Sequence, residues 1–320
     1  MSPGRLLERW RSWTPSPTAL RRAFLATLAT NAGIVVTGGA VRLTASGLGC
    51  PTFPRCTDQS LVVTRETGGH GLIEFGNRTL TFVLTAAVVV AVVVAWRAGR
   101  ADLRRLALLL LAGIAAQALW GGIVVLTELN PVWVLTHFLL SMVIIAVAVY
   151  AYELAGGVRV PEQRVVHPTV LLGGRSLVAA TAALLVVGTV VTGTGPHSGD
   201  PEATDRLPFD LLEVTQLHAD LVFLVGGLAL GLTVALYAVE APGGLRRRAV
   251  TLIGVLIGQG AVGYLQYWTD LPVGLVVVHL LGACLVWIAS LRLLLGMTTR
   301  VARFAPGPDH EQLPATTTAT

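Results

Sequence analysis

The sequence has no lysine, only three cysteines and little charge of either sign. Charged residues make up 13% of the 320 residues, about half of the roughly 25% found in soluble globular domains. Hydrophobic residues make up 53%, and they form long runs such as 82–96 and 177–191. Because a membrane-spanning helix needs about 20 apolar residues, these figures exclude an ordinary soluble enzyme and a large soluble domain. They predict an all-α integral membrane protein in a lipid bilayer.

The basic residues are all arginine, and their positions indicate how the chain is oriented. A net charge of +5 and a pI near 9.6 would suit a nucleic-acid-binding protein, but the arginines lie in short segments between apolar runs. Such segments mark the cytoplasmic side of a membrane, so no nucleic-acid partner is expected. We expect a plasma-membrane protein with cytoplasmic termini and with segments 44–71 and 196–215 outside. Eight spans are predicted, at 22–43, 72–96, 106–126, 133–154, 176–195, 216–239, 249–268 and 273–296.

Two parts of the chain repeat each other. Segment 117–137 aligns without gaps on 259–279 at an offset of 142, and its last residue, His137, falls on His279. Each half has four spans, an even number, so the halves have the same orientation in the membrane. The repeat predicts two tandem four-helix bundles. The expected organisation is a cytoplasmic N-terminal segment (1–21), a first bundle (22–158), a cytoplasmic linker (159–175), a second bundle (176–298) and a disordered tail (299–320).

Three histidines lie within the predicted spans, one to two helical turns from the outer surface. They are His137, His218 and His279, and Asn77 falls on His218 at an offset of 141. Ionisable residues inside a membrane are candidate functional sites, although a single histidine can simply hydrogen-bond a neighbouring helix. Imidazole is a common axial ligand of haem iron, and facing helices of a bundle can each supply one. His218 and His279 fit such a pair, whereas zinc would need further ligands at the same depth.

Several motifs together resemble the haem A synthase family. Residues 38–56, GGAVRLTASGLGCPTFPRC, resemble the family's first outer loop, which has a Gly-Leu-x-Cys-Pro-x-Trp-Pro pattern. Residues 74–78, EFGNR, are similar to its Glu-x-x-His-Arg motif, and residues 194–200, TGPHSGD, resemble the exit of its fifth helix. The resemblance extends from about residue 22 to residue 296 and includes all eight spans and the repeat.

The resemblance implies an oxidoreductase that acts in cytochrome oxidase assembly. The family oxidises the C8 methyl group of haem O to a formyl group and so produces haem A. By this resemblance His218 and His279 hold a haem b cofactor, and the first bundle receives haem O at His137, with Asn77 and Arg78 nearby. The implied partners are haem O, a haem O synthase that delivers it and an electron acceptor that the sequence does not identify. The oligomeric state stays open.

Two features of the outer side have alternative interpretations. Glu74 matches the family's catalytic glutamate and would suit a proton acceptor; alternatively it pairs with Arg78, four residues later in the helix. Cys50 and Cys56 match a redox-active pair, and both are expected in an oxidising compartment; a purely structural disulfide is the alternative. Cys284 is expected to be a small apolar residue of the last span.

The sequence departs from the family pattern at two positions. Asn77 replaces the usual second-helix histidine, and asparagine is a poor iron ligand; His70 either substitutes for it or is a solvated loop residue. Phe53 stands where the pattern has tryptophan. Arg42 and His197 match at an offset of 155 and are candidates for contacts to haem propionates, or for anchoring at the membrane interface.

Three classes of function remain after these considerations. The outer-loop motif and Glu74 favour a haem A synthase. A di-haem b-type electron carrier is the main alternative, but it would be expected to have a histidine at position 77. A transporter would fit eight spans and a repeat, but the sequence has neither a broken helix nor a charge pair at mid-membrane.

Overall fold

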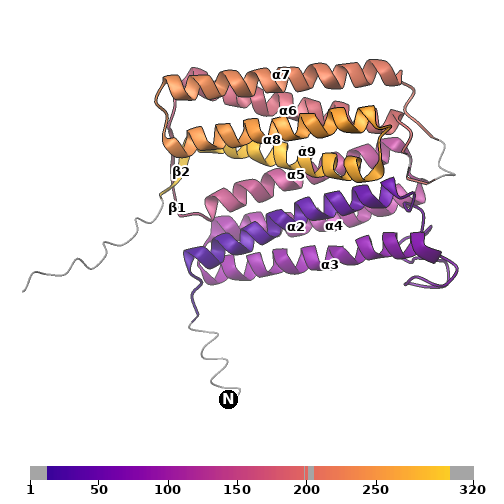
Figure 1. The fold of residues 1–320 in the computed structure, drawn as a ribbon. Coiled ribbons are helices and arrows are strands. Elements are labelled where there is room, and N and C mark those ends of the chain that lie inside the picture. Colours follow the sequence, from indigo (N-terminus) through magenta and orange to yellow (C-terminus); the bar gives the residue numbers. More distant parts are fainter. Residues whose placement is uncertain (1–12, 198, 201–204, 303–320) are drawn as a thin grey trace, which may run out of the picture.

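The computed structural model describes residues 13–197, 199–200 and 205–302. In chain order these residues form α2 (Pro17–Leu43), α3 (Gly68–Arg97), α4 (Ala101–Leu126), α5 (Pro131–Leu154), β1 (Val158–Arg164), α6 (Pro168–Thr194), α7 (Leu211–Ala238), α8 (Gly243–Trp268), α9 (Val273–Gly296) and β2 (Thr298–Ala302) (Figure 1). All eight of these helices are long and apolar enough to cross a membrane. The prediction of an eight-span, all-helical membrane protein is confirmed.

Most helices begin before the apolar runs that predict them. The largest difference is at α6, which starts at Pro168 rather than at residue 176, so that part of the expected linker 159–175 is helical. Proline suits the first helical turn because the N–H that it lacks would have no partner there. The His167 side chain also accepts a hydrogen bond from the Thr169 amide (3.3 Å). Hydropathy marks only the part of a helix that lies in lipid, and these helices extend beyond it.

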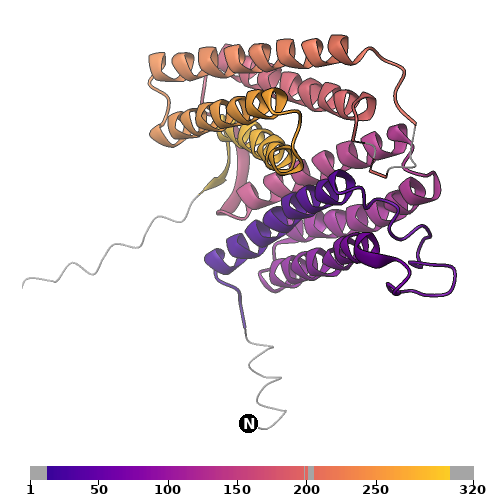
Figure 2. The ribbon, with the colours of Figure 1, turned by 45° about the vertical axis from the view of Figure 1, so that its right-hand side comes forward.

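The helices form two bundles that follow the order of the chain. α2 to α5 pack around one another in the first bundle and α6 to α9 in the second, and each bundle is closed by contact between its first and fourth helices. Figure 2 shows the first bundle, from indigo to magenta, below the second. Large apolar side chains such as Phe82 and Phe223 point outward (76% and 68% exposed), as expected for a surface that faces lipid. The predicted tandem arrangement agrees with these contacts.

The two bundles meet along a seam formed by α2 and α5 on one side and α6 and α9 on the other. Within the seam, the buried Trp287 indole donates a hydrogen bond to the Met142 carbonyl (2.9 Å). Near the end of the molecule where β1 and β2 lie, called the strand end below, the Glu153 carboxylate of α5 binds Arg248 of α8 and Arg292 of α9, both at 2.7 Å. Polar contacts therefore fix the bundles relative to each other in addition to apolar packing.

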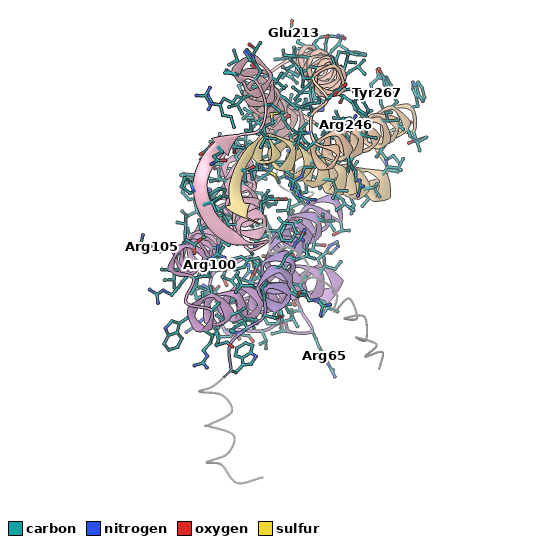
Figure 3. The ribbon with its side chains drawn as sticks, turned by 90° about the vertical axis from the view of Figure 1, so that its left-hand side faces the viewer. Arg65, Arg100, Arg105, Glu213, Arg246 and Tyr267 are labelled. Carbon is teal, nitrogen blue, oxygen red and sulfur yellow. A yellow bond between two sulfur atoms is a disulfide. The ribbon has the colours of Figure 1, made fainter. Side chains whose placement is uncertain are left out.

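A small sheet, not predicted from the sequence, also joins the two halves. β1 follows α5 and β2 follows α9, and the two strands pair antiparallel with Arg164 opposite Thr298. Figure 3 looks onto this end of the molecule, where the strands lie at the junction of the bundles. Residues 299–302, assigned to a disordered tail by the sequence, belong to this sheet, and residues 303–320 lie outside the described part of the chain.

Candidate functional site

The three intramembrane histidines lie at the end of the molecule that is opposite the strands. His137 is the seventh residue of α5, His279 the seventh of α9 and His218 the eighth of α7. All three side chains are half-buried. The expected depth, one to two turns inside the helix ends, agrees with this placement.

Each imidazole lies against a glycine of a neighbouring helix. The pairs are His137 with Gly121 of α4, His218 with Gly188 of α6, and His279 with Gly263 of α8. A Cβ atom at these glycines would lie 3.5, 3.1 and 3.4 Å, respectively, from the Cε1 atom of the ring. A residue larger than alanine would therefore displace the ring, so the glycines provide the room in which the imidazoles lie.

None of the three imidazoles has a hydrogen-bond partner within the described residues. The Nδ1 atom of each ring is buried and unpaired, and leaving a buried polar atom unpaired is costly. A hydrogen bond to a neighbouring helix, the simplest alternative explanation of an intramembrane histidine, is therefore not what these rings make. Unpaired imidazoles in an apolar surrounding fit the requirements of an axial haem ligand.

Two matching glutamines hold the backbone beside two of these histidines. The Gln117 side chain of α4 donates to the His137 carbonyl (3.1 Å), and the Gln259 side chain of α8 donates to the His279 carbonyl (3.0 Å). Gln117 also donates to Ser141 one turn further along α5 (2.6 Å). These bonds fix the histidine-bearing helix against its neighbour in both bundles. The repeat aligns the two glutamines, but their role depends on helix packing and was missed in the sequence.

The two bundles differ at the position that faces the fourth helix. In the second bundle both positions are histidines, His218 on α7 and His279 on α9. In the first bundle Asn77 takes the place of His218, and its side-chain oxygen accepts a hydrogen bond from Thr37 of α2 (2.7 Å). The exposed His70, at the start of α3, contacts Ser46 instead (2.9 Å).

Glu74 and Arg78 of α3 bind the outer loop that contains the cysteines. Cys50 and Cys56 form a disulfide, which confirms the expected pair. The buried Glu74 carboxylate accepts hydrogen bonds from the Cys50 amide (2.7 Å) and from Arg78 Nε (3.1 Å). The ion pair considered as the alternative role of Glu74 is therefore present, and it also fastens a loop. The Arg78 guanidinium completes this attachment by donating to the carbonyls of Cys50 (2.9 Å), Thr52 (3.1 Å) and Arg55 (3.2 Å).

Arg42 and His197 lie near the outer ends of the two bundles. Arg42, at the end of α2, donates to the Thr192 carbonyl of α6 (2.8 Å), while its Nε atom is buried without a partner. His197 Nε2 lies 3.3 Å from the Leu271 carbonyl oxygen, just before α9. Arg42 therefore connects the first bundle to the second.

The described residues contain no group of three or more histidine, cysteine or carboxylate side chains that could hold a metal ion. A protein-ligated zinc site, which needs three or four such ligands, is therefore not supported within this part of the chain. Haem makes a smaller demand, because the porphyrin itself supplies four ligands to iron and the protein adds one or two. The paired and single imidazoles of the two bundles fit that demand.

A comparison with protein-family models matches residues 21–291 to COX15-CtaA, described as cytochrome oxidase assembly protein. The chain belongs to this family. The match covers all of helices α3 to α8 and most of α2 and α9, so the cytochrome oxidase assembly family includes both bundles and every histidine discussed above. The resemblance to haem A synthases stated from the sequence is confirmed at this level. No curated protein sequence matches the chain.

Proposed function

We propose that this member of the cytochrome oxidase assembly family is a haem A synthase, which oxidises the C8 methyl group of haem O to a formyl group. The observation that carries the proposal is the set of three unpaired imidazoles, each against a glycine, at one end of α5, α7 and α9. Membership of an oxidase assembly family supports a haem-related role.

In this proposal the two bundles have different tasks. His218 and His279 would hold a resident haem b, which would accept and pass on electrons when bound. His137 would bind the substrate haem O in the first bundle, with Asn77 and Arg78 beside it. Two strong axial ligands suit a permanent cofactor, whereas one suits a substrate that has to leave. Support for the difference comes from Asn77, whose oxygen is already engaged by Thr37.

Glu74 is the proposed catalytic residue of the first bundle. Conversion of a methyl group to a formyl group releases protons as well as electrons, so the site needs a proton acceptor. Among the described residues Glu74 is the only buried acidic residue (5% exposed), and it lies on α3 about one turn from Asn77. Arg78 and the Cys50 amide would orient its carboxylate. Arg42 and His197 are proposed to contact haem propionates.

The proposed location is the plasma membrane, with the strand end in the cytoplasm and the histidine end outside. Arg100 and Arg105 at the start of α4 and Arg246 at the start of α8 lie toward the strand end (Figure 1), which the positive-inside rule then assigns to the cytoplasm. The Cys50–Cys56 disulfide is at the other end, where an oxidising compartment would maintain it. A haem O synthase in the same membrane would deliver the substrate.

The experiment that tests the function is haem extraction from the purified protein after co-expression with a haem O synthase. Chromatography should detect haem b together with haem A or a hydroxylated intermediate between haem O and haem A. Two equivalents of haem b without haem O products would instead indicate a di-haem electron carrier. A protein that purifies without any haem would contradict both haem functions and favour a transporter.

The proposed difference between the bundles predicts the effect of Asn77→His. By the repeat, position 77 corresponds to His218 of the second bundle, so in this proposal the new imidazole should provide a second axial ligand and raise the low-spin haem that co-purifies by up to one equivalent per chain. Absorption spectra and haem quantification measure the change. The increase should disappear in the double variant Asn77→His, His137→Ala. An unchanged haem content in Asn77→His would argue against a haem site between α3 and α5.

A further inference from the structure

The disulfide loop places one aromatic side chain inside the first bundle. Phe53 lies between the two cysteines in the outer loop, and its half-buried ring packs against Gly122 of α4. A Cβ atom at Gly122 would come within 2.6 Å of the Phe53 Cδ1 atom, which is closer than two carbon atoms can approach. The phenyl ring therefore fills the space that a side chain at position 122 would occupy.

Phe53 reaches the depth of the first-bundle histidine. Gly122 is four residues before the end of α4, which places it about one turn inside the helix end. The preceding residue, Gly121, is the one that contacts the His137 ring. Phe53 and His137 thus pack against adjacent residues of α4, with the ring of Phe53 entering from the outer surface.

The attachments of the loop hold its backbone and not the Phe53 ring. Arg78 binds carbonyls on both sides of Phe53, those of Thr52 and Arg55, and the disulfide closes the base of the loop. No hydrogen bond is made by Phe53 itself within the described residues, so packing alone holds its ring in place. A side chain whose backbone is fixed on both sides, and whose ring is held only by apolar packing, can leave its site by rotating about its side-chain bonds while the loop stays in place.

The second bundle has no such arrangement at the matching position. The repeat aligns Gly122 with Tyr264 of α8, whose side chain is 53% exposed and packs against Trp268 of its own helix (5.6 Å between ring centroids). A tyrosine at this position leaves no space on the helix for an aromatic ring from a loop. Among the described residues, a ring from an outer loop packs on the helix at this position in the bundle with one imidazole and not in the bundle with two.

We propose that Phe53 is a movable cover of the His137 site, whose ring closes the outer mouth of the first bundle and swings out to admit and release the substrate haem. The nature of the substrate rests on the proposed function, whereas the cover itself rests on the packing of Phe53 against Gly122. A resident haem between His218 and His279 would need no cover that opens, which agrees with the difference between the bundles in the part of the chain that the structure describes.

The cover can be tested without haem O, by the rate at which diethyl pyrocarbonate modifies His137. The full-length protein would be purified from cells without a haem O synthase, and the modified histidines would be measured by mass spectrometry. Phe53→Ala removes the apolar contact that keeps the ring in place and should raise the rate at His137 roughly tenfold, with His218 and His279 unchanged. Phe53→Trp should restore slow modification.

A second variant tests the same contact from the helix side. Gly122→Ala introduces a methyl group where the Phe53 ring lies, so it should expel the ring and raise His137 modification as Phe53→Ala does. The matched controls are Phe209→Ala, an exposed phenylalanine in the outer loop before α7, and Gly258→Ala, a glycine of α8 with nothing within 4 Å of its Cβ position. Non-reducing mass spectrometry would verify that Cys50 and Cys56 stay linked. An unchanged rate of His137 modification in both Phe53→Ala and Gly122→Ala would contradict the proposal that Phe53 covers the His137 site.

Measurements of haem O binding distinguish a failure of the proposed cover from a failure of the proposed function. Added haem O should bind and dissociate about tenfold faster in Phe53→Ala than in the parent protein, because the same contact controls both directions. His137→Ala should abolish this binding signal. If His137 modification rises but no variant, including the parent, binds haem O, the cover stands and the proposed function fails. If haem O binds the parent and Phe53→Ala at equal rates, the cover is wrong and the function is unaffected.

Discussion

Replacing His279 with glycine should abolish the low-spin haem spectrum that the proposed function assigns to the protein, and His218→Gly should do the same. A bis-histidine haem loses its six-coordinate, low-spin state when either ligand is removed. The His279 ring has an unpaired Nδ1 and lies against Gly263, which has no side chain that could take its place. Absorption and electron paramagnetic resonance spectra of the purified variants measure the loss.

Chemical rescue makes this test specific. Glycine leaves a cavity the size of an imidazole, and free imidazole added to His279→Gly should restore the low-spin spectrum. The control is His167→Ala, which removes a histidine at the opposite end of the molecule, where it caps α6, and which should leave the spectrum intact. A parental spectrum in both glycine variants would show that His218 and His279 are not the ligands.

Glu74→Gln should lower the rate of haem A formation by about a hundredfold or more, because a general base contributes that much to catalysis. Glutamine preserves the size of the side chain but cannot accept the proton. Haem b content should stay near the parental level, since His218 and His279 belong to the other bundle. Chromatography of extracted haems would follow both quantities in the same cells.

The role of Glu74 in fastening the loop requires two controls. Arg78→Gln removes the cation that binds the loop carbonyls but retains the carboxylate, so it should impair turnover less than Glu74→Gln. Glu213→Gln changes an exposed glutamate near the outer end of α7 and should have no effect. Haem A formation by Glu74→Gln at the parental rate would remove Glu74 from the chemistry.

Much of the fold could be predicted because its determinants are local or repeated. Apolar runs of the right length give the spans, and the register between residues 117–137 and 259–279 gives the two bundles. The sheet between β1 and β2 could not be foreseen, because its strands are short and are separated by four helices. The early start of α6 was missed for a different reason: it depends on the cap at His167 and on Pro168, which precede Arg175 and the apolar run on which the prediction was based.

The site was predictable to the extent that chain spacing defines it. Intramembrane position identified His137, His218 and His279, and the four-residue spacing of Glu74 and Arg78 gave their ion pair. Contacts between segments far apart in the chain could not be predicted from the sequence. The packing of Phe53 on Gly122 depends on where an outer loop returns to the bundle, and nothing in the sequence near either residue encodes it. The bond between Thr37 and Asn77 likewise depends on how α2 and α3 are rotated against each other.

The seam between the bundles also fixes the ratio in which the two kinds of bundle occur. By the repeat, the counterpart of Glu153 in the second bundle is Leu295, and the counterparts of Arg248 and Arg292 in the first are Leu106 and Tyr150. Two copies of the first bundle placed together would bring two glutamates together without arginine partners, and two copies of the second would bring four arginines together without a carboxylate; like charges at such a contact repel each other. Only unlike halves are complementary. Each molecule therefore joins one bundle of each kind, and association of whole chains, in whatever number, preserves that one-to-one ratio.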